Sequence, residues 1–221
     1  MKPLLVVGSS GHASIVLEAI ELRGEFNVLG LLDSFEAKGT LKHGYLVRGA
    51  AEDAAEIAEV YGCHSFVVAI GDNWARWKIA NAIATASNGV EFPAVVHPSV
   101  VFSKSARIGP GTVVMPAAVV GPNAILGEGC IVNIASVVNH DCRMADYSSL
   151  SGGVHLAGSI AIGMRSSVGI GSTIREKVSI GRDSVIGAGT VVLDDIPDEV
   201  VAYGVPAKVI RQRAPDERYM R

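Results

Sequence analysis

The chain has 221 residues, of which 49% are hydrophobic, 19% charged and 5% aromatic, and its net charge is −3. This composition excludes an intrinsically disordered chain, and the negative charge argues against a nucleic-acid-binding protein, which needs a basic surface. No apolar run reaches the roughly 18 residues of a membrane-spanning helix, and an odd number of cysteines favours a reducing compartment, so we expect a soluble cytoplasmic protein without membrane insertion.

The first part of the chain alternates strand-like and helix-like segments. Strand-like runs lie at residues 3–7, 28–32 and 66–70, and helix-like stretches at 14–22, 50–60 and 74–86. Strands that alternate with helices predict a small parallel sheet covered by helices. We therefore expect an α/β, Rossmann-like nucleotide-binding domain over residues 1–94.

A glycine-rich loop, Gly8-Ser9-Ser10-Gly11-His12, follows the first strand and opens the first helix. Backbone N–H groups at the start of a helix are suited to hold a phosphate. The loop lacks the three glycines of the dinucleotide-binding fingerprint, so a tight turn without a ligand is the alternative interpretation.

The pattern changes at Val96, from which every sixth residue is apolar. The seventeen positions are Val96, Phe102, Ile108, Val114, Val120, Leu126, Val132, Val138, Met144, Leu150, Leu156, Ile162, Val168, Ile174, Ile180, Ile186 and Val192. A fixed period of six predicts a parallel β-helix in which three hexads form one triangular coil. Residues 95–196 would then hold between five and six coils.

Two further features of the hexads carry expectations. Glycine follows the apolar position at 109, 121, 127, 163, 169, 181 and 187, where we expect a turn that needs a permissive backbone. Cys130 and Cys142 are two hexads apart, which places them on different sides of the prism as small core residues. Residues 197–221 would form a cap and tail, because Pro and Gly end the coil there.

The combined motifs resemble one family of enzymes. They are the Gly8–His12 loop, Ala69-Ile70-Gly71-Asp72-Asn73 with Arg76, the hexads, Asn139-His140-Asp141-Cys142, and Gly204-Val205-Pro206-Ala207-Lys208. The chain resembles the hexapeptide-repeat nucleotide-sugar acetyltransferases, which include sialic acid O-acetyltransferases and the bacillosamine-pathway and perosamine N-acetyltransferases. The resemblance implies left-handed coils, a homotrimer and acetyl-CoA as co-substrate, and it departs from the bacillosamine type at Asn139 and Ser149.

His140 is the expected general base for acetyl transfer. It occupies an outward position of its hexad beside Asp141, which could orient the ring and stabilise its charged form. Gly158 follows His140 by one full coil, so its N–H should lie next to the ring as an oxyanion donor, which is also the position that the resemblance implies. Asn133 matches a polar active-site position of relatives.

The resemblance also implies binding residues. For a nucleotide sugar they are Gly8, Ser9, Ser10, Gly11, His12, Asp33, Asn73 and Arg76, with a surface charge as the alternative for Arg76. For acetyl-CoA they are Gly158, His155, Ala188, Gly204, Pro206 and Lys208, with Lys208, Arg211 and Arg213 as a basic cluster for its phosphates or else a solvated tail. His155 has a solvated or interface residue as its alternative.

The expected activity is acetyl-CoA-dependent N-acetylation of a UDP- or GDP-linked 4-amino-4,6-dideoxy sugar for bacterial glycan or lipopolysaccharide biosynthesis. O-acetylation of a sialic acid-type sugar by the same His140 is the alternative. A zinc hydratase on the same β-helix is less favoured, because His97, His140 and His155 are not separated by whole coils and cannot stack on one corner. We therefore expect no metal, and a scaffold without catalysis leaves the His140–Asp141 pair unexplained.

Overall fold

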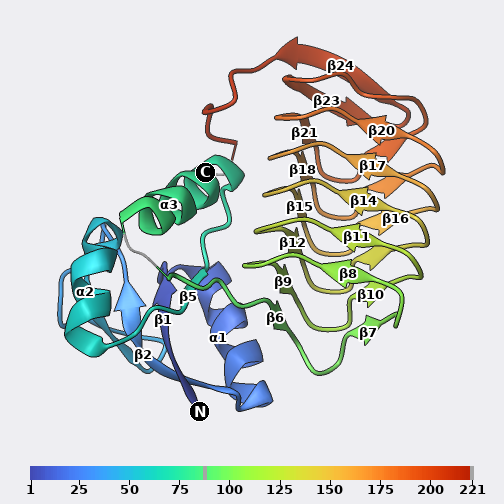
Figure 1. Ribbon diagram of the computed structural model, residues 1–221. Coiled ribbons are helices and arrows are strands. Elements are labelled where there is room, and N and C mark those ends of the chain that lie inside the picture. The colour runs from blue at the N-terminus through green and yellow to red at the C-terminus, as the bar shows by residue number, and fades with distance from the viewer. Residues whose placement is uncertain (87–88, 220–221) are drawn as a thin grey trace.

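The computed structural model describes residues 1–86 and 89–219. It consists of an α/β unit beside a prism of short stacked strands (Figure 1). The elements of the α/β unit are β1 Lys2–Val7, α1 Gly11–Arg23, β2 Phe26–Leu32, β3 Leu41–Lys42, β4 Tyr45–Gly49, the 3-10 turn η1 Ala51–Asp53, α2 Ala54–Tyr61, β5 Phe66–Val68 and α3 Asn73–Ala86. Their alternation confirms the predicted Rossmann-like class.

The sheet of this unit has the order β3-β4-β2-β1-β5, and its pairs are parallel except β3 with β4. The pattern of the sequence does not predict β3 and β4, because they are short and only partly buried. One face of β1 packs through Leu4 and Val6 against α1, and the other packs through Leu5 and Val7 against α2 and α3. The carboxyl ends of β1, β2 and β5 therefore lie together at one edge of a two-sided sheet.

The prism is a left-handed parallel β-helix with three sheets. The first holds β6 Val95–Val96, β9 Val113–Val114, β12 Ile131–Val132, β15 Ser149–Leu150, β18 Ser167–Val168 and β21 Val185–Ile186. The second holds β7 Val101–Phe102, β10 Val119–Val120, β13 Val137–Val138, β16 His155–Leu156, β19 Thr173–Ile174 and β22 Val191–Val192. The third holds β8 Arg107–Ile108, β11 Ile125–Leu126, β14 Arg143–Met144, β17 Ala161–Ile162 and β20 Ser179–Ile180. Each strand pairs with the strand three hexads later, as the period predicts.

The apolar sixth residues form the inside of the prism. From Val114 to Val192 they are all at most 2% exposed, whereas Val96, Phe102 and Ile108 are partly buried. Those three belong to the first coil, which has no coil beneath it. Cys130 and Cys142 are fully buried in the same core, as expected from their spacing.

The expected reason for the repeated glycines is wrong. The left-handed backbone falls on every sixth residue from Gly111 to Gly189, and most of those residues are not glycine. A Cβ on Gly109, Gly163 or Gly181 would instead lie within 2.5 Å of backbone atoms of the next coil. The glycines after the apolar position are therefore required by the close stacking of coils and not by the turn.

The α/β unit and the prism share apolar cores. Val113, Met115 and Ile131 point outward from the first sheet of the prism and pack in one cluster with residues of β1 and α1. The prism ends with β23 Val200–Gly204, which pairs parallel with β21, and β24 Ala207–Gln212, which folds back on β23. Residues 213–219, here called the C-terminal strap, then cross from the top of the prism to α3 (Figure 1).

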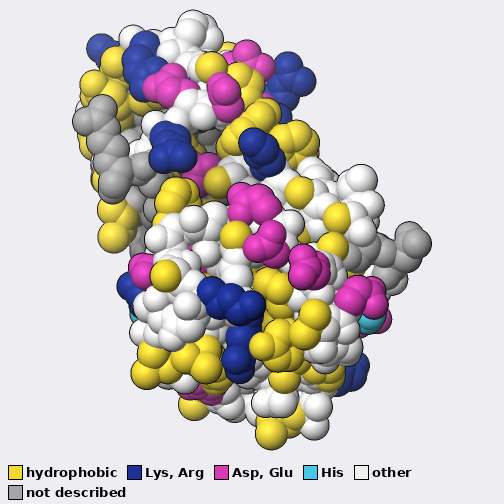
Figure 2. Space-filling view, turned by 90° about the vertical axis from the view of Figure 1, so that its left-hand side faces the viewer, with side chains coloured by type: hydrophobic (Ala, Val, Ile, Leu, Met, Phe, Trp, Pro, Cys, Tyr) yellow, Lys and Arg dark blue, Asp and Glu magenta, His cyan; other side chains and the backbone are white. Residues whose placement is uncertain are grey.

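On the face turned to the viewer in Figure 2, acidic and basic side chains are interspersed, and neither sign covers it. Within the described ranges, the longest helices are too short and insufficiently apolar to cross a bilayer.

Candidate active site

His140 and Asp141 lie on the corner of the prism between β13 and β14. Nδ1 of His140 is 2.8 Å from Oδ2 of Asp141, and Nδ2 of Asn123 donates to the other carboxylate oxygen at 3.1 Å. The hydrogen bond from His140, and after it that from Asn123, lowers the pKa of Asp141, which is therefore ionised near neutral pH. A carboxylate at Nδ1 places the ring proton on that nitrogen, so Nε2 of a neutral His140 is a free proton acceptor.

Gly158 lies against the ring of His140, one coil further along the same corner. A Cβ built on Gly158 would fall 2.4 Å from Cε1 and 2.6 Å from Nε2 of His140. The carbonyl of Gly158 accepts a hydrogen bond from the N–H of Lys177. The N–H of Gly158 donates to no acceptor among the described residues. Gly158 and the ring of His140 therefore lie side by side, as the spacing of one coil predicts.

Asn133 lies on a different corner, directly after β12. His155 is exposed on β16, in the sheet that separates the corner of Asn133 from the corner of His140. One chain therefore does not bring Asn133, His155 and His140 to a single point.

The two glycines of the glycine-rich loop differ in their surroundings, since Gly8 lies against backbone and Gly11 lies in open space. Gly8 has φ +107°, and a Cβ there would lie 2.8 Å from the carbonyl oxygen of Ala69 at the end of β5. Ser9 donates its hydroxyl proton to Asp33 at 2.6 Å, which joins the ends of β1 and β2. The open turn at Gly11 begins α1, and a Cβ on Gly11 would meet no atom within 4 Å.

Two cavities lie on opposite sides of this loop. The first, of about 510 Å³, lies beyond the carboxyl ends of the strands and is lined by Gly8, Ser9, Ser10 and Asp33 among others. The second, of about 450 Å³, lies between the loop and the prism and is lined by Gly11, His12, Asn133 and Ala188 among others. We call them the strand-end cavity and the prism cavity. Gly71 lines both, so the two are neighbours.

His12 carries an unusual nitrogen in the prism cavity. Its Nε2 is buried and has no hydrogen-bond partner among the described residues. Burial, and after it the positive charge of Arg76, lowers the pKa of His12 to about 4. The ring of His12 is therefore neutral near neutral pH, with one buried nitrogen that has no partner among the described residues.

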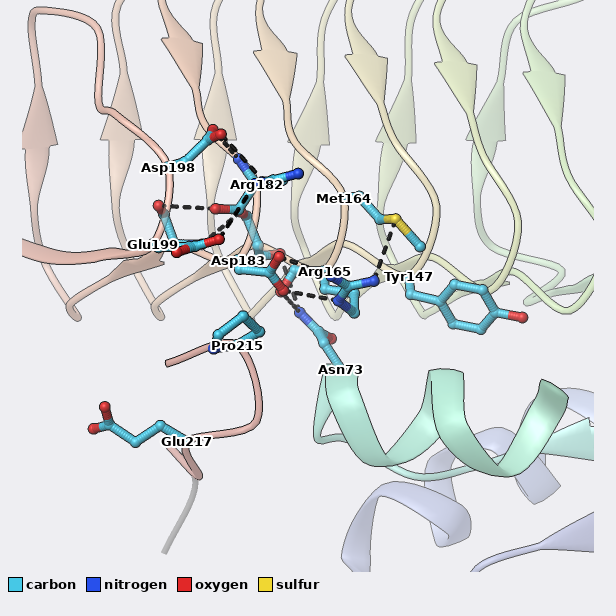
Figure 3. A network of polar contacts seen from close by, with 12 residues as sticks. Asn73, Tyr147, Met164, Arg165, Arg182, Asp183, Asp198, Glu199, Pro215 and Glu217 are labelled. Atoms are coloured by element: carbon cyan, nitrogen blue, oxygen red, sulfur yellow. Dashed lines mark hydrogen bonds and ion pairs between the residues drawn. The ribbon is translucent and has the colours of Figure 1, made fainter. Parts of the chain in front are cut away.

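The predicted substrate contacts at Asn73 and Arg76 are wrong, and so is the alternative of a surface charge for Arg76. Arg76 is 1% exposed, and all its donors are used by the carbonyls of Ile70, Gly71, Gly129 and Tyr147 and by Oδ1 of Asn73. Asn73 donates to the carbonyls of Arg165 and Ser166 at 3.1 Å (Figure 3). These two residues tie α3 to the prism, because buried polar groups need partners in the protein.

The three cations near the cap do not form the predicted basic cluster. Arg213 is buried and donates to the carbonyls of Asp183, Pro215 and Glu217, and Arg211 pairs with Glu217 at 2.6 Å. Lys208 is exposed on β24, and Gly204 and Pro206 flank the turn between β23 and β24, where the Val205–Pro206 bond is cis.

Several residues of the cavities were not predicted. The strand-end cavity is also lined by Trp74, Lys78 and two residues of the strap, Asp216 and Arg218. A third cavity of about 440 Å³ is lined by Arg175 and Lys177, on the corner that carries His140 and Gly158. Arg175 and Lys177 could have been predicted by moving one coil onward from the positions that flank Gly158. Asp216 and Arg218 could not, because the strap lies outside the repeat and has no periodic pattern.

The comparisons with known proteins cover both parts of the chain. Residues 3–83 match the family described as PglD N-terminal domain. The UDP-N-acetylbacillosamine N-acetyltransferase of Bacillus subtilis is 33% identical over 116 residues, which are 52% of this chain and 52% of that protein. That match thus spans about half the length of this curated relative.

Among the solved structures that match over nearly their full length are the following two. PerB from Caulobacter crescentus, in complex with CoA and GDP-perosamine, is 34% identical with a TM-score of 0.89, covering 96% of this chain and 98% of that chain. The acetyltransferase domain of PglB from Neisseria gonorrhoeae, in complex with acetyl coenzyme A, is 34% identical with a TM-score of 0.87, covering 95% and 99%. The chain therefore belongs to the hexapeptide-repeat acetyltransferase family that includes the bacillosamine and perosamine N-acetyltransferases.

Proposed function

We propose that this chain is an acetyl-CoA-dependent N-acetyltransferase that acts on the amino group of a UDP- or GDP-linked 4-amino-4,6-dideoxy sugar. The observation that carries the proposal is the His140–Asp141 pair over the unused N–H of Gly158, in a chain that also has cavities on both sides of a glycine-rich loop. The similarity to PerB in complex with CoA and GDP-perosamine supports the same assignment.

In the proposed reaction His140 acts as the general base. Its Nε2 takes a proton from the sugar amine as the nitrogen attacks the thioester carbonyl, and Asp141 stabilises the imidazolium that forms. The N–H of Gly158 donates to the carbonyl oxygen as it gains negative charge. The thiolate of coenzyme A then leaves and takes up the proton of the imidazolium, which returns His140 to its neutral form.

The nucleotide sugar would bind across the two neighbouring cavities. The nucleoside fits the strand-end cavity, where Asp33 ends β2 in the position that binds ribose in related sheets. The N-terminus of α1, at Ser10 and Gly11, favours the diphosphate. The sugar would then reach the prism cavity, where Nε2 of His12 offers a hydrogen bond and Asn133 lines the wall.

Acetyl-CoA would bind along the corner of His140. Arg175 and Lys177 lie in the cavity two coils beyond His140 and carry the positive charge that the phosphates need, although Arg175 also pairs with Asp194 at 3.7 Å. We retain His155, Ala188, Gly204, Pro206 and Lys208 as proposed contacts of the cofactor.

We also propose that the protein is a cytoplasmic homotrimer serving bacterial glycan biosynthesis. In one chain, neither the strand-end nor the prism cavity has His140 among the described residues that line it. Ile134 and Ile170, on the corner of Asn133, are 41% and 62% exposed, which suits contact with a neighbouring copy. A shared site would join the prism cavity of one subunit to His140 of the next.

The proposed units are residues 1–94 for the nucleotide sugar, 95–196 for catalysis and 197–221 for the cap.

The test is a panel of UDP- and GDP-linked 4-amino sugars with acetyl-CoA, read by release of free thiol. The panel includes the matching 4-hydroxy sugars and a free sialic acid. Turnover of amino sugars alone supports the proposal. Turnover restricted to hydroxyl acceptors would establish an O-acetyltransferase instead. If no sugar of the panel led to release of thiol, both activities would be refuted for these sugars.

A further inference from the structure

The C-terminal strap runs over the boundary between the two cavities. Arg218 lines the strand-end cavity, and the next residue, Tyr219, lines the prism cavity. Two consecutive residues thus face the two sides of the loop that begins α1. A ligand that extends from one cavity to the other would therefore lie next to this part of the strap.

The strap is held in place at both ends by contacts to the rest of the protein. At its start, Arg213 is 7% exposed and donates to the carbonyl of Asp183 on the prism. At its end, the hydroxyl of Tyr219 accepts from the N–H of Asn73 at 3.3 Å, and the ring of Tyr219 lies 5.7 Å from the Arg213 guanidinium. Figure 3 shows the strap, marked by Pro215 and Glu217, beside the Asn73–Arg165–Asp183 network. Its path is therefore set by buried polar contacts.

Among the described residues, the strand-end cavity has two cations that pair with no carboxylate, and one of them, Arg218, belongs to the strap. Two cations line this cavity, Lys78 and Arg218, against the carboxylates of Asp33, Glu52, Asp72 and Asp216. Asp33 already accepts from Ser9 and from the N–H of Phe35, and Asp72 accepts from the N–H of Ala75. Arg218 is exposed, and none of the described carboxylates pairs with it, in contrast to Arg211 of β24, which pairs with Glu217.

We propose that Arg218 is a substrate-binding residue that contacts the diphosphate of the nucleotide sugar. The inference rests on the proposed function, because it takes the ligand to be a nucleoside diphosphate joined to a sugar. The guanidinium offers a planar fork of donors that matches phosphate oxygens, and Arg218 lines the same cavity as Ser10, which directly precedes α1. The strap thereby adds the C-terminal end of the chain to a site otherwise built from the α/β unit and the prism.

The test is calorimetric titration of GDP and UDP, and of guanosine and uridine, into the full chain. Arg218→Ala should weaken the better of the two diphosphates about tenfold, an effect of about 1.4 kcal/mol, and leave the matching nucleoside unchanged. Arg218→Lys should lose less, because the charge remains and only the fork is lost. Lys38→Ala is the control, since Lys38 is an exposed cation of the α/β unit that is not among the residues lining either cavity. In steady state, Arg218→Ala should raise KM for the sugar and leave KM for acetyl-CoA and kcat unchanged.

The outcomes separate this inference from the proposed function. Equal losses for diphosphate and nucleoside, or no loss for either, would overturn the contact with the diphosphate while the wild type still binds nucleotides. Failure of the wild type to bind GDP and UDP would overturn the inference together with the proposed substrate class.

Discussion

At the scale of single residues, the pair of His140 and Asp141 accounts for the proton transfer that the proposed reaction needs. General base catalysis contributes about 10²–10⁴-fold to a rate. His140→Ala should therefore lower kcat by about that factor, and Asp141→Asn should cost less because the base remains. The position is exposed, so the melting temperature should stay near that of the wild type. Wild-type kcat in a folded His140→Ala variant would remove His140 from the mechanism.

The contact between His140 and Gly158 predicts an effect of a single methyl group. In Gly158→Ala the new Cβ would fall 2.4 Å from Cε1 of His140, so the ring must turn away from Asp141. We expect kcat to fall nearly as far as in His140→Ala, with the fold retained. The control is Gly152→Ala, whose Cβ would meet its nearest atom at 3.5 Å. Similar kcat values for Gly158→Ala and Gly152→Ala would show that the ring of His140 is not held against Gly158.

His12 predicts a dependence of stability on pH. Its pKa is about 4 in the folded protein, against about 6.5 for an unfolded histidine. Between these values the unfolded chain binds one more proton, so stability is fully present above about pH 6.5 and falls as the pH drops towards 4. The gap between the two pKa values corresponds to at most about 3–4 kcal/mol.

The measurement is the urea midpoint of the wild type and of His12→Gln from pH 7 to pH 4. The variant should lose less stability over this range, because Gln does not titrate. Parallel curves would mean that His12 is protonated in the folded state.

At the scale of elements, the stacking of coils depends on glycines where the backbone of the next coil comes closest. In Gly163→Ala the Cβ would fall 2.4 Å from the backbone nitrogen of Arg182, which costs about 2–3 kcal/mol through overpacking. Gly189→Ala is the contrasting variant, since Gly189 has φ +64° with open space around it and should cost about 1 kcal/mol. Chemical denaturation measures both free energies, and the reverse order would contradict the role given to these glycines.

At the scale of the whole molecule, the separation of the prism cavity from His140 predicts a site shared between subunits. His140→Ala and Gly8→Val should each be inactive, the first without its base and the second because a side chain on Gly8 meets the carbonyl of Ala69. The two variants are mixed, denatured and refolded together, which gives mixed trimers. In these trimers some interfaces join an intact cavity of one subunit to an intact His140 of the next. The mixed trimers should then regain a fraction of the wild-type activity. Light scattering should show that they are trimers.

No recovery of activity in mixed trimers would place the whole site within one chain. A monomer in light scattering at micromolar concentration would refute the shared site directly. Each parent variant refolded alone is the control for recovery by refolding.

The sequence was sufficient for the periodic placement of residues along the prism, although not for the reason why glycine recurs there. The period of six determines which residues face inward, and a spacing of three hexads places Gly158 beside His140. Both follow from local geometry, because each coil pairs only with its neighbours. The glycine-rich loop and the order of strands and helices likewise predicted the edge of the sheet at which the strand-end cavity lies.

The structural roles of Arg76 and Asn73, and the place of Arg218 beside the strand-end cavity, were decided only by the tertiary structure. Arg76 meets carbonyls 53 and 71 residues away, and Tyr219 meets Asn73 across 146 residues. Contacts over such distances leave no period or short motif in the sequence. An arginine next to a predicted loop therefore resembles a ligand-binding residue whether it points into a cavity or is buried between the α/β unit and the prism, and only the packing of the two parts distinguishes these cases.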